Sequence, residues 1–134
     1  MSIIAIKRDF KSFIEHYITG YNIHVYTTYN DSMRTNSPSV VVDVISSRSV
    51  RTLKSNSTFH TKVDRLVNVV IVSDDLLELD TISDLFENYF TKNPDYFSSC
   101  FVFGISSITP ITLAFEEKED VWKRTFVIEV KEIL

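Results

Sequence analysis

The sequence predicts an α+β fold, a two-layer sandwich in which two helices cover one mainly antiparallel sheet of four to five strands. Two segments carry apolar residues at spacings of three and four, which is typical of amphipathic helices. Several others alternate apolar with polar residues, which is typical of strands with one buried face. Their order along the 134 residues is helix, strand, strand, strand, helix, strand, strand. This length fits a single domain, 1–134.

The N-terminal part predicts the first helix and two strands. Apolar residues recur at helical spacing over residues 3–17, and Gly20 can take the left-handed conformation past a helix end. Residues 22–28 alternate and predict a strand. Residues 39–45 are apolar and β-branched apart from Asp43, and therefore predict a second strand.

Residues 46–62 form the one long segment without clear periodicity. The segment is rich in Ser and Thr and has four basic residues and no acid, a local charge of +4. A structureless loop of this length is unusual in a small domain, and such loops are often functional or disordered. Two alternatives stay open: a mobile loop, or two strand ends drawn out into an extended hairpin. The basic residues are Arg48, Arg51, Lys54 and Lys62.

The middle of the chain predicts a strand followed by the second helix. Residues 63–72 alternate and form a long third strand. Asp75 and Glu78 have the spacing of a capping box, in which each side chain satisfies a backbone amide of the first helical turn. The apolar helical stripe that follows must end before Pro94, because the residue preceding a proline disfavours helical geometry.

The C-terminal part predicts the last strands. Residues 100–103 and 108–113 are apolar and β-prone, and form one bent strand or two short ones. Residues 121–131 alternate over their whole length, so we expect the apolar face of this closing strand to complete the sheet beneath the helices. Lys123 and Glu129 fall on its other face.

Composition excludes several classes of protein. A hydrophobic content of 44% excludes general disorder. A net charge of −4 argues against a dedicated nucleic-acid binder, since such proteins neutralise phosphates. The single cysteine, Cys100, excludes an intrachain disulfide and a multi-cysteine zinc site. No apolar run is long enough to span a bilayer, and we expect a soluble intracellular protein without a membrane partner.

The strongest enzyme-like signal is Glu129 and Lys131 on the closing strand, together with Asp43. Magnesium-dependent nucleases combine carboxylates that hold the ion with a lysine that stabilises phosphate charge. The spacing is common by chance, and an alternating strand places the pair equally well on a solvated face, so the nuclease is a minor alternative. The histidines have no companion at ligand spacing. We therefore expect no catalytic residue, no cofactor and no metal.

The second helix is strongly acidic, with only Lys92 against its acids. A solvated face with favourable charge at the helix N-terminus explains this pattern. Alternatively, the acids and the basic residues 46–62 are complementary patches that suit a head-to-tail contact between copies, which closes into a ring. DNA contact by the basic segment is a weaker alternative, because only Phe59 could stack on a base. The acids are Asp74, Asp75, Glu78, Asp80, Asp84, Glu87 and Asp95.

This arrangement resembles the tail terminator, or tail-completion and head–tail joining, proteins of long-tailed bacteriophages. The resemblance spans residues 3–130. It lies in the opening helix, the strand 23–26, the start of the second strand at 37–42, the long polar insertion, the strand–helix unit 63–90 and the closing strand at 122–126.

The resemblance implies a structural virion protein without enzymatic activity. Such proteins cap the tail tube as a ring, often a hexamer, and join it to the head connector, so the implied partners are copies of this chain, the tail tube protein and a head completion protein. The implied location is the head-proximal end of the tail, after assembly in the host cytoplasm. Another phage neck or tail-tube protein on a related sandwich is the alternative. Candidate subunit or tube contacts are Arg48, Arg51, Lys54, Lys123 and Glu129.

Overall fold

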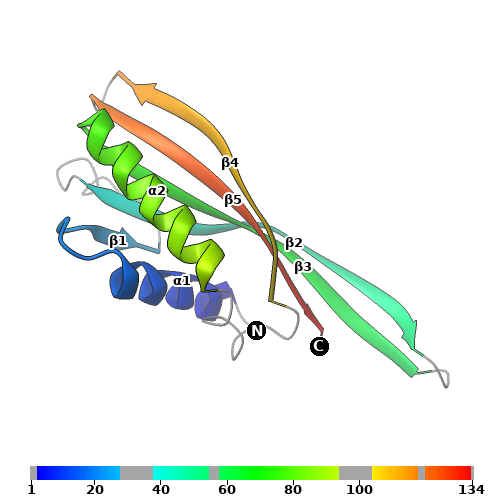
Figure 1. The fold of residues 1–134 in the computed structure, drawn as a ribbon. Coiled ribbons are helices and arrows are strands. Elements are labelled where there is room, and N and C mark those ends of the chain that lie inside the picture. Colours follow the sequence, from blue (N-terminus) through cyan, green and yellow to red (C-terminus); the bar gives the residue numbers. More distant parts are fainter. Residues whose placement is uncertain (1–2, 28–37, 55–57, 94–103, 118–119, 134) are drawn as a thin grey trace.

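The computed structural model describes residues 3–27, 38–54, 58–93, 104–117 and 120–133, and at 45–64, 104–112, 116 and 131–133 the description covers the backbone only. It confirms the predicted α+β architecture and the predicted order of elements. Both helices lie on one face of a long, twisted sheet (Figure 1). The elements are α1 (Ile3–Tyr17), β1 (His24–Tyr26), β2 (Ser39–Lys54), β3 (Thr58–Ser73), α2 (Leu76–Lys92), β4 (Gly104–Glu116) and β5 (Val121–Ile133).

The five strands form one sheet in the order β1-β2-β3-β5-β4. The pairing of β1 with β2 is parallel, and the other three pairings are antiparallel. Residues 104–116 form one strand with two register shifts, which includes the predicted segment 108–113, while the predicted segment 100–103 lies outside the described residues. Pro110 lies in the edge strand β4 at the register shift between Pro110 and Thr112, and edge strands and irregularities of this kind are where sheets tolerate proline.

The described residues of the segment 46–62, which are 46–54 and 58–62, form the two strands of an extended hairpin. β2 and β3 are each 16 residues long and remain paired from Ser39–Val72 to Lys54–Thr58. β5 accompanies β3 only as far as the pair Lys62–Ile133, so the end of the hairpin is a two-stranded ribbon in the described part of the chain. Figure 1 shows this ribbon continuing well beyond the part of the sheet that the helices cover.

The hydrophobic core lies between the helices and one face of the sheet. Phe13 of α1, Phe86 of α2 and Phe126 of β5 meet there, with ring centroids 6.1 Å apart for Phe13 and Phe86 and 5.2 Å for Phe86 and Phe126. Every second residue of β3 from Val67 to Ile71 faces this layer. The apolar face of β5 lies beneath the helices, as predicted. Its buried members are Phe126, Ile128 and Val130.

The ends of the elements follow local chemistry. α1 ends at Tyr17, and Gly20 has a φ of +91°, which a glycine adopts without steric cost. β1 is shorter than the predicted strand at 22–28, because Asn22 has a φ of +50° and lies in the left-handed region. α2 ends at Lys92, before the proline, as predicted.

The predicted capping box at the start of α2 differs from the structure in one detail. The Asp75 carboxylate accepts a hydrogen bond from the Leu77 amide at 3.0 Å, as an N-cap should. Ser73, rather than Glu78, serves the backbone amide of Asp75. Its hydroxyl accepts from that amide at 3.1 Å and donates to Glu78 Oε1 at 2.9 Å. The cap therefore ties the end of β3 to the first turn of α2.

Candidate subunit interface

The three basic candidates of the polar segment lie on the projecting β2–β3 hairpin. Arg48 is in register with Asp64 of β3, and Lys54 is in register with Thr58 at the far end. Arg51 lies between them, beyond the last pair that β3 makes with β5. The fold therefore orders these residues along the hairpin: Arg48 lies at its base, where β5 still pairs with β3, and Arg51 and Lys54 lie on the two-stranded ribbon.

Lys123 and Glu129 lie on the sheet face away from the helices. They alternate with core residues such as Ile128, and both side chains are half-buried. Lys123 is in register with Val72, which is itself buried, and Glu129 is in register with Leu66. Six residues of strand separate the two charges, about 20 Å.

The structure brings Glu129, but not Lys123, close to the base of the hairpin. Glu129 pairs across β5 and β3 with Leu66, which pairs in turn with Ser46 of β2. Arg48 is two residues further along β2. Of the five sequence candidates, Glu129 thus lies nearest to Arg48, while Arg51 and Lys54 lie further out along the hairpin and Lys123 lies towards the opposite end of β5.

Part of the acidic stripe of α2 has roles within the chain. Asp75 caps the helix and Glu78 holds Ser73, as described above. Asp80 accepts a hydrogen bond at 2.6 Å from Arg124 Nη2, which explains why a charged residue interrupts the apolar face of β5. The sequence contained no signal for this pair, since its members are 44 residues apart. The described members of the stripe that remain exposed are Asp74, Asp84 and Glu87.

Asp43, the carboxylate assigned to the nuclease alternative, forms an ion pair with α1. Lys7 Nζ lies 2.9 Å from Asp43 Oδ1 and donates a second hydrogen bond, at 3.0 Å, to the Thr27 carbonyl. The same Oδ1 accepts from the Val44 amide. Lys7 therefore ties α1 to the edge of the sheet next to β1, a role that the sequence did not predict because its partners lie in distant segments.

The nuclease residues do not converge on one site. Asp43 and Glu129 lie on strands that β3 separates, about 10 Å across the sheet and about 7 Å along it. A magnesium ion needs its ligand oxygens about 2.1 Å away, so one ion cannot be held by both carboxylates in this arrangement. Within the described residues no group of three or more His, Cys, Asp or Glu side chains could hold a metal. No observation therefore favours the nuclease.

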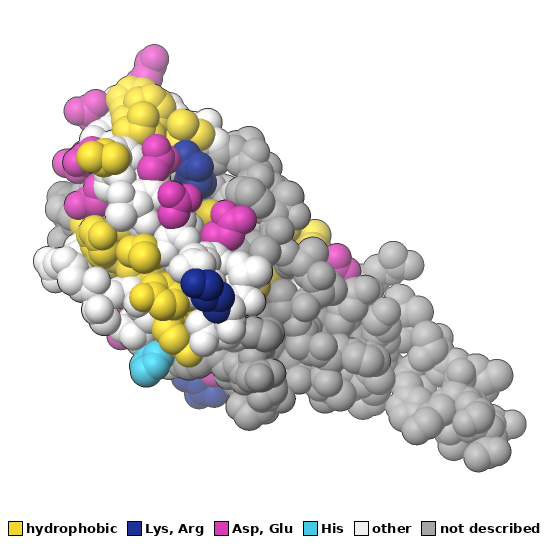
Figure 2. Space-filling model, viewed as in Figure 1, with side chains coloured by type: hydrophobic (Ala, Val, Ile, Leu, Met, Phe, Trp, Pro, Cys, Tyr) yellow, Lys and Arg dark blue, Asp and Glu magenta, His cyan; other side chains and the backbone are white. Residues whose placement is uncertain are grey.

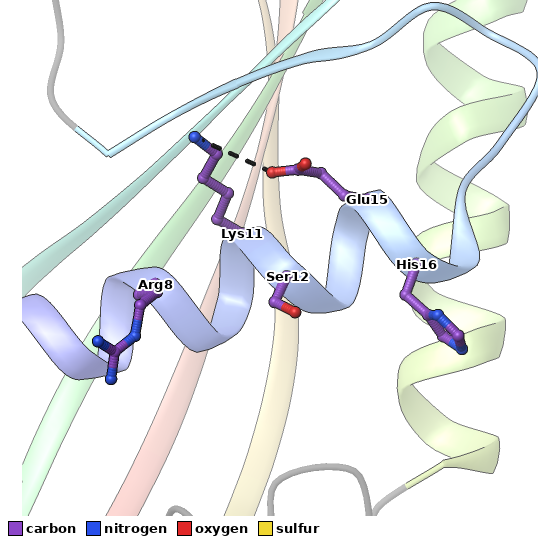
Figure 3. A pocket seen from close by; sticks show the side chains of 5 residues that line it. All are labelled: Arg8, Lys11, Ser12, Glu15 and His16. Atoms are coloured by element: carbon purple, nitrogen blue, oxygen red, sulfur yellow. Dashed lines mark ion pairs between the residues drawn. The ribbon is translucent and has the colours of Figure 1, made fainter.

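A hollow of about 480 Å³ lies on the outer side of α1 (Figure 3). Its described lining residues are Arg8, Lys11, Ser12, Glu15 and His16, all from this one helix. Lys11 and Glu15 pair with each other at 4.0 Å on one side of the helix, while Arg8, Ser12 and His16 point to the other. Side chains that diverge in this way do not form a binding site.

Comparisons with known proteins add no family. No family model matches the chain, and no curated protein sequence matches it significantly. Neither of the two described helices combines the length and the apolar character that crossing a bilayer requires. A functional proposal for this protein therefore rests on the fold and on the positions of the charged residues.

Proposed function

We propose that this protein is a structural component of the virion of a long-tailed phage, a tail terminator that caps the tail tube as a ring and joins it to the head connector. The observation that carries the proposal is the β2–β3 hairpin, which continues as a ribbon beyond the helix-covered body (Figure 1). Arg51 and Lys54 lie on this ribbon, and Arg48 lies at its base.

A projecting two-stranded ribbon suits contact with another chain. Isolated hairpins are marginal in water, and their edges leave backbone groups that a neighbour can satisfy. The hairpin lies at one end of the molecule and the start of α2 at the other (Figure 1). An elongated subunit with different surfaces at its two ends forms head-to-tail contacts, and these close into a ring when the rotation allows it.

The ring explains how tube growth would stop. One face of the ring binds the last ring of tube subunits, and the other face binds the connector. Elongation ends because the second face lacks the surface with which tube subunits bind one another. We expect subunit or tube contacts at Arg48, Arg51, Lys54, Lys123 and Glu129, of which Lys123 and Glu129 lie on the sheet face away from the helices.

Light scattering after size-exclusion chromatography tests the proposal. The protein is sized alone and after mixing with tubes assembled from the tail tube protein of the same virus, and the tube ends are imaged by electron microscopy. We expect a ring of several subunits at one end of each tube, and tubes that no longer lengthen when tube protein is added. A strict monomer that ignores tubes and is absent from virions would refute the proposal.

Another neck or tail-tube protein on a related sandwich is the competing function, because a projecting hairpin serves any ring contact equally well. The position of the protein in the virion separates the two. Cryo-electron microscopy should show one ring at the head-proximal end of the tail. Density repeated along the tube would instead assign the chain to the tube itself.

A further inference from the structure

Four exposed hydrophobic side chains lie at the end of the molecule opposite the hairpin. Leu76 and Leu77 occupy the first turn of α2, and Leu77 is 75% exposed. Leu113 and Phe115, near the end of the edge strand β4, are 45% and 43% exposed. Together they are called the apolar end patch, and the mutual position of their two elements follows from the sheet register.

The register brings α2 and β4 together at this end. Trp122 pairs with Ser73, which ends β3 just before α2, and on its other side with Phe115, whose ring centroid lies 4.8 Å from its own. Leu113 pairs with Arg124, the residue that binds Asp80 of α2. The half-buried Trp122 and Arg124 thus lie between the two halves of the patch.

Acidic side chains surround the patch. Figure 2 shows hydrophobic side chains gathered where α2 begins, with acidic side chains beside them. Exposed hydrophobic residues with a polar rim mark surfaces that bind a partner, and although Arg124 lies within the patch, the exposed acids leave this end with an excess of negative charge. The exposed acids on the elements and turns of this end are Asp74, Asp75, Glu117 and Asp120.

We infer that the apolar end patch is the acceptor surface for the basic hairpin of a second copy of this chain. The hairpin segment 46–62 has a charge of +4 and no acid, so its charge complements the acidic rim. Donor and acceptor lie at opposite ends of one molecule (Figure 1), so a subunit can use both at once. The inference rests on the proposed ring, and it names the surface through which each subunit holds the next.

A matched pair of substitutions tests the acceptor. Leu77 and Ile4 both lie in the first turn of a helix and are 75% and 76% exposed, but Ile4 is on α1, outside the patch. We expect Leu77→Asp to weaken self-association, measured by sedimentation velocity, about tenfold or more, and Ile4→Asp to leave it unchanged. Equal effects of the two variants, or no effect of Leu77→Asp, would overturn the assignment.

A charge exchange tests the donor. Arg51→Glu with Lys54→Glu should weaken self-association about as much as Leu77→Asp. Mixing this variant with one that carries Glu117→Lys and Asp120→Lys should restore association between the two proteins, because the signs are complementary again. Failure of the mixed pair to associate, when each variant is folded by circular dichroism, would contradict the pairing of these two surfaces.

Cross-linking separates this inference from the proposed function. In a Cys100→Ser background, Leu77→Cys mixed with Thr52→Cys should give a disulfide-linked dimer, and Ile4→Cys mixed with Thr52→Cys should not. Rings that cap tubes without the Leu77–Thr52 cross-link would overturn the inference and leave the tail terminator standing. The cross-link in a protein that never binds tubes would support the inference and remove the proposed function.

Discussion

The helix-covered body and the projecting hairpin contrast within a single strand. In the body, β3 carries Val67, Val69 and Ile71, all buried against the two helices. In the hairpin, the same strand begins with Thr58 and proceeds through residues that are mostly polar or charged, with no helix above them (Figure 1). Burial against the helices therefore determines the sequence of one half, and no helix covers the other (Figure 1).

The two halves of β3 therefore have different roles. Its C-terminal half supplies the apolar surface that stabilises the fold. Its N-terminal half extends into a two-stranded ribbon that no helix covers, the element that the proposed function assigns to contact with another chain.

Removal of a central ring should damage the body most. Phe86 is fully buried, and its ring contacts those of Phe13, Phe90 and Phe126. We expect Phe86→Ala to lower the free energy of unfolding by about 3–5 kcal/mol, measured by urea denaturation. Asn88→Ala, at an exposed position of the same helix, is the control and should change it by less than about 0.5 kcal/mol.

Shortening the hairpin should leave the body intact and abolish assembly. Val50 and Lys62 are paired, so residues 51–61 can be replaced by Asn-Gly, a two-residue turn that closes hairpins. We expect the free energy of unfolding to stay within about 1 kcal/mol of the wild type, while ring formation is lost in light scattering. If the shortened chain unfolds at a much lower urea concentration, the hairpin contributes to the stability of the fold, and the division into a stable body and a separate assembly element is wrong.

Loss of the helix cap should destabilise the body moderately. The Asp75 carboxylate satisfies the Leu77 amide at the start of α2. Asp75→Ala should cost about 1 kcal/mol in urea denaturation, because that amide loses its partner. Asp84→Ala, an exposed acid in the middle of the same helix, should have little effect. A cost for Asp84→Ala equal to that of Asp75→Ala would point to net charge rather than capping.

The smallest effect is expected for the tie between α1 and the sheet edge. Lys7 contacts both Asp43 and the Thr27 carbonyl, but the Asp43 side chain is 55% exposed, so water screens the pair. Lys7→Gln should cost about 0.5–1 kcal/mol in the free energy of unfolding. Lys11→Gln removes only the 4.0 Å pair with Glu15 and should cost less, about 0.3 kcal/mol.

Periodicity was sufficient to predict the body. The two helices and the closing strand each have a buried face, so their patterns show in the sequence and their bounds agree with the structure to within a few residues. The parallel pairing of β1 with β2 could not be predicted, because the sequence of a three-residue strand does not indicate which strand it pairs with or in which direction. Tertiary pairs such as Asp80–Arg124 and Lys7–Asp43 were missed for the same reason, since they join distant segments.

The candidate interface was predicted only in part. The charge of residues 46–62 was plain in the sequence, but strand alternation is imposed by burial of one face. Because residues 46–62 show no clear alternation, the hairpin could not be distinguished from a loop in the sequence. The apolar end patch was also missed, since Leu77 and Phe115 looked like ordinary apolar residues until the register placed them at one exposed end.

Hydrogen exchange in the free and the tube-bound protein tests the contrast most directly. In the free protein, the amides of Val67–Ile71 and of Phe126–Ile128 should exchange slowly, and those of the hairpin at 48–61 should exchange much faster. On tubes, we predict that protection of the hairpin rises about tenfold or more while that of the body is unchanged. A hairpin that is as protected as the body in the free monomer, or that gains no protection on tubes, would contradict its role as the assembly element.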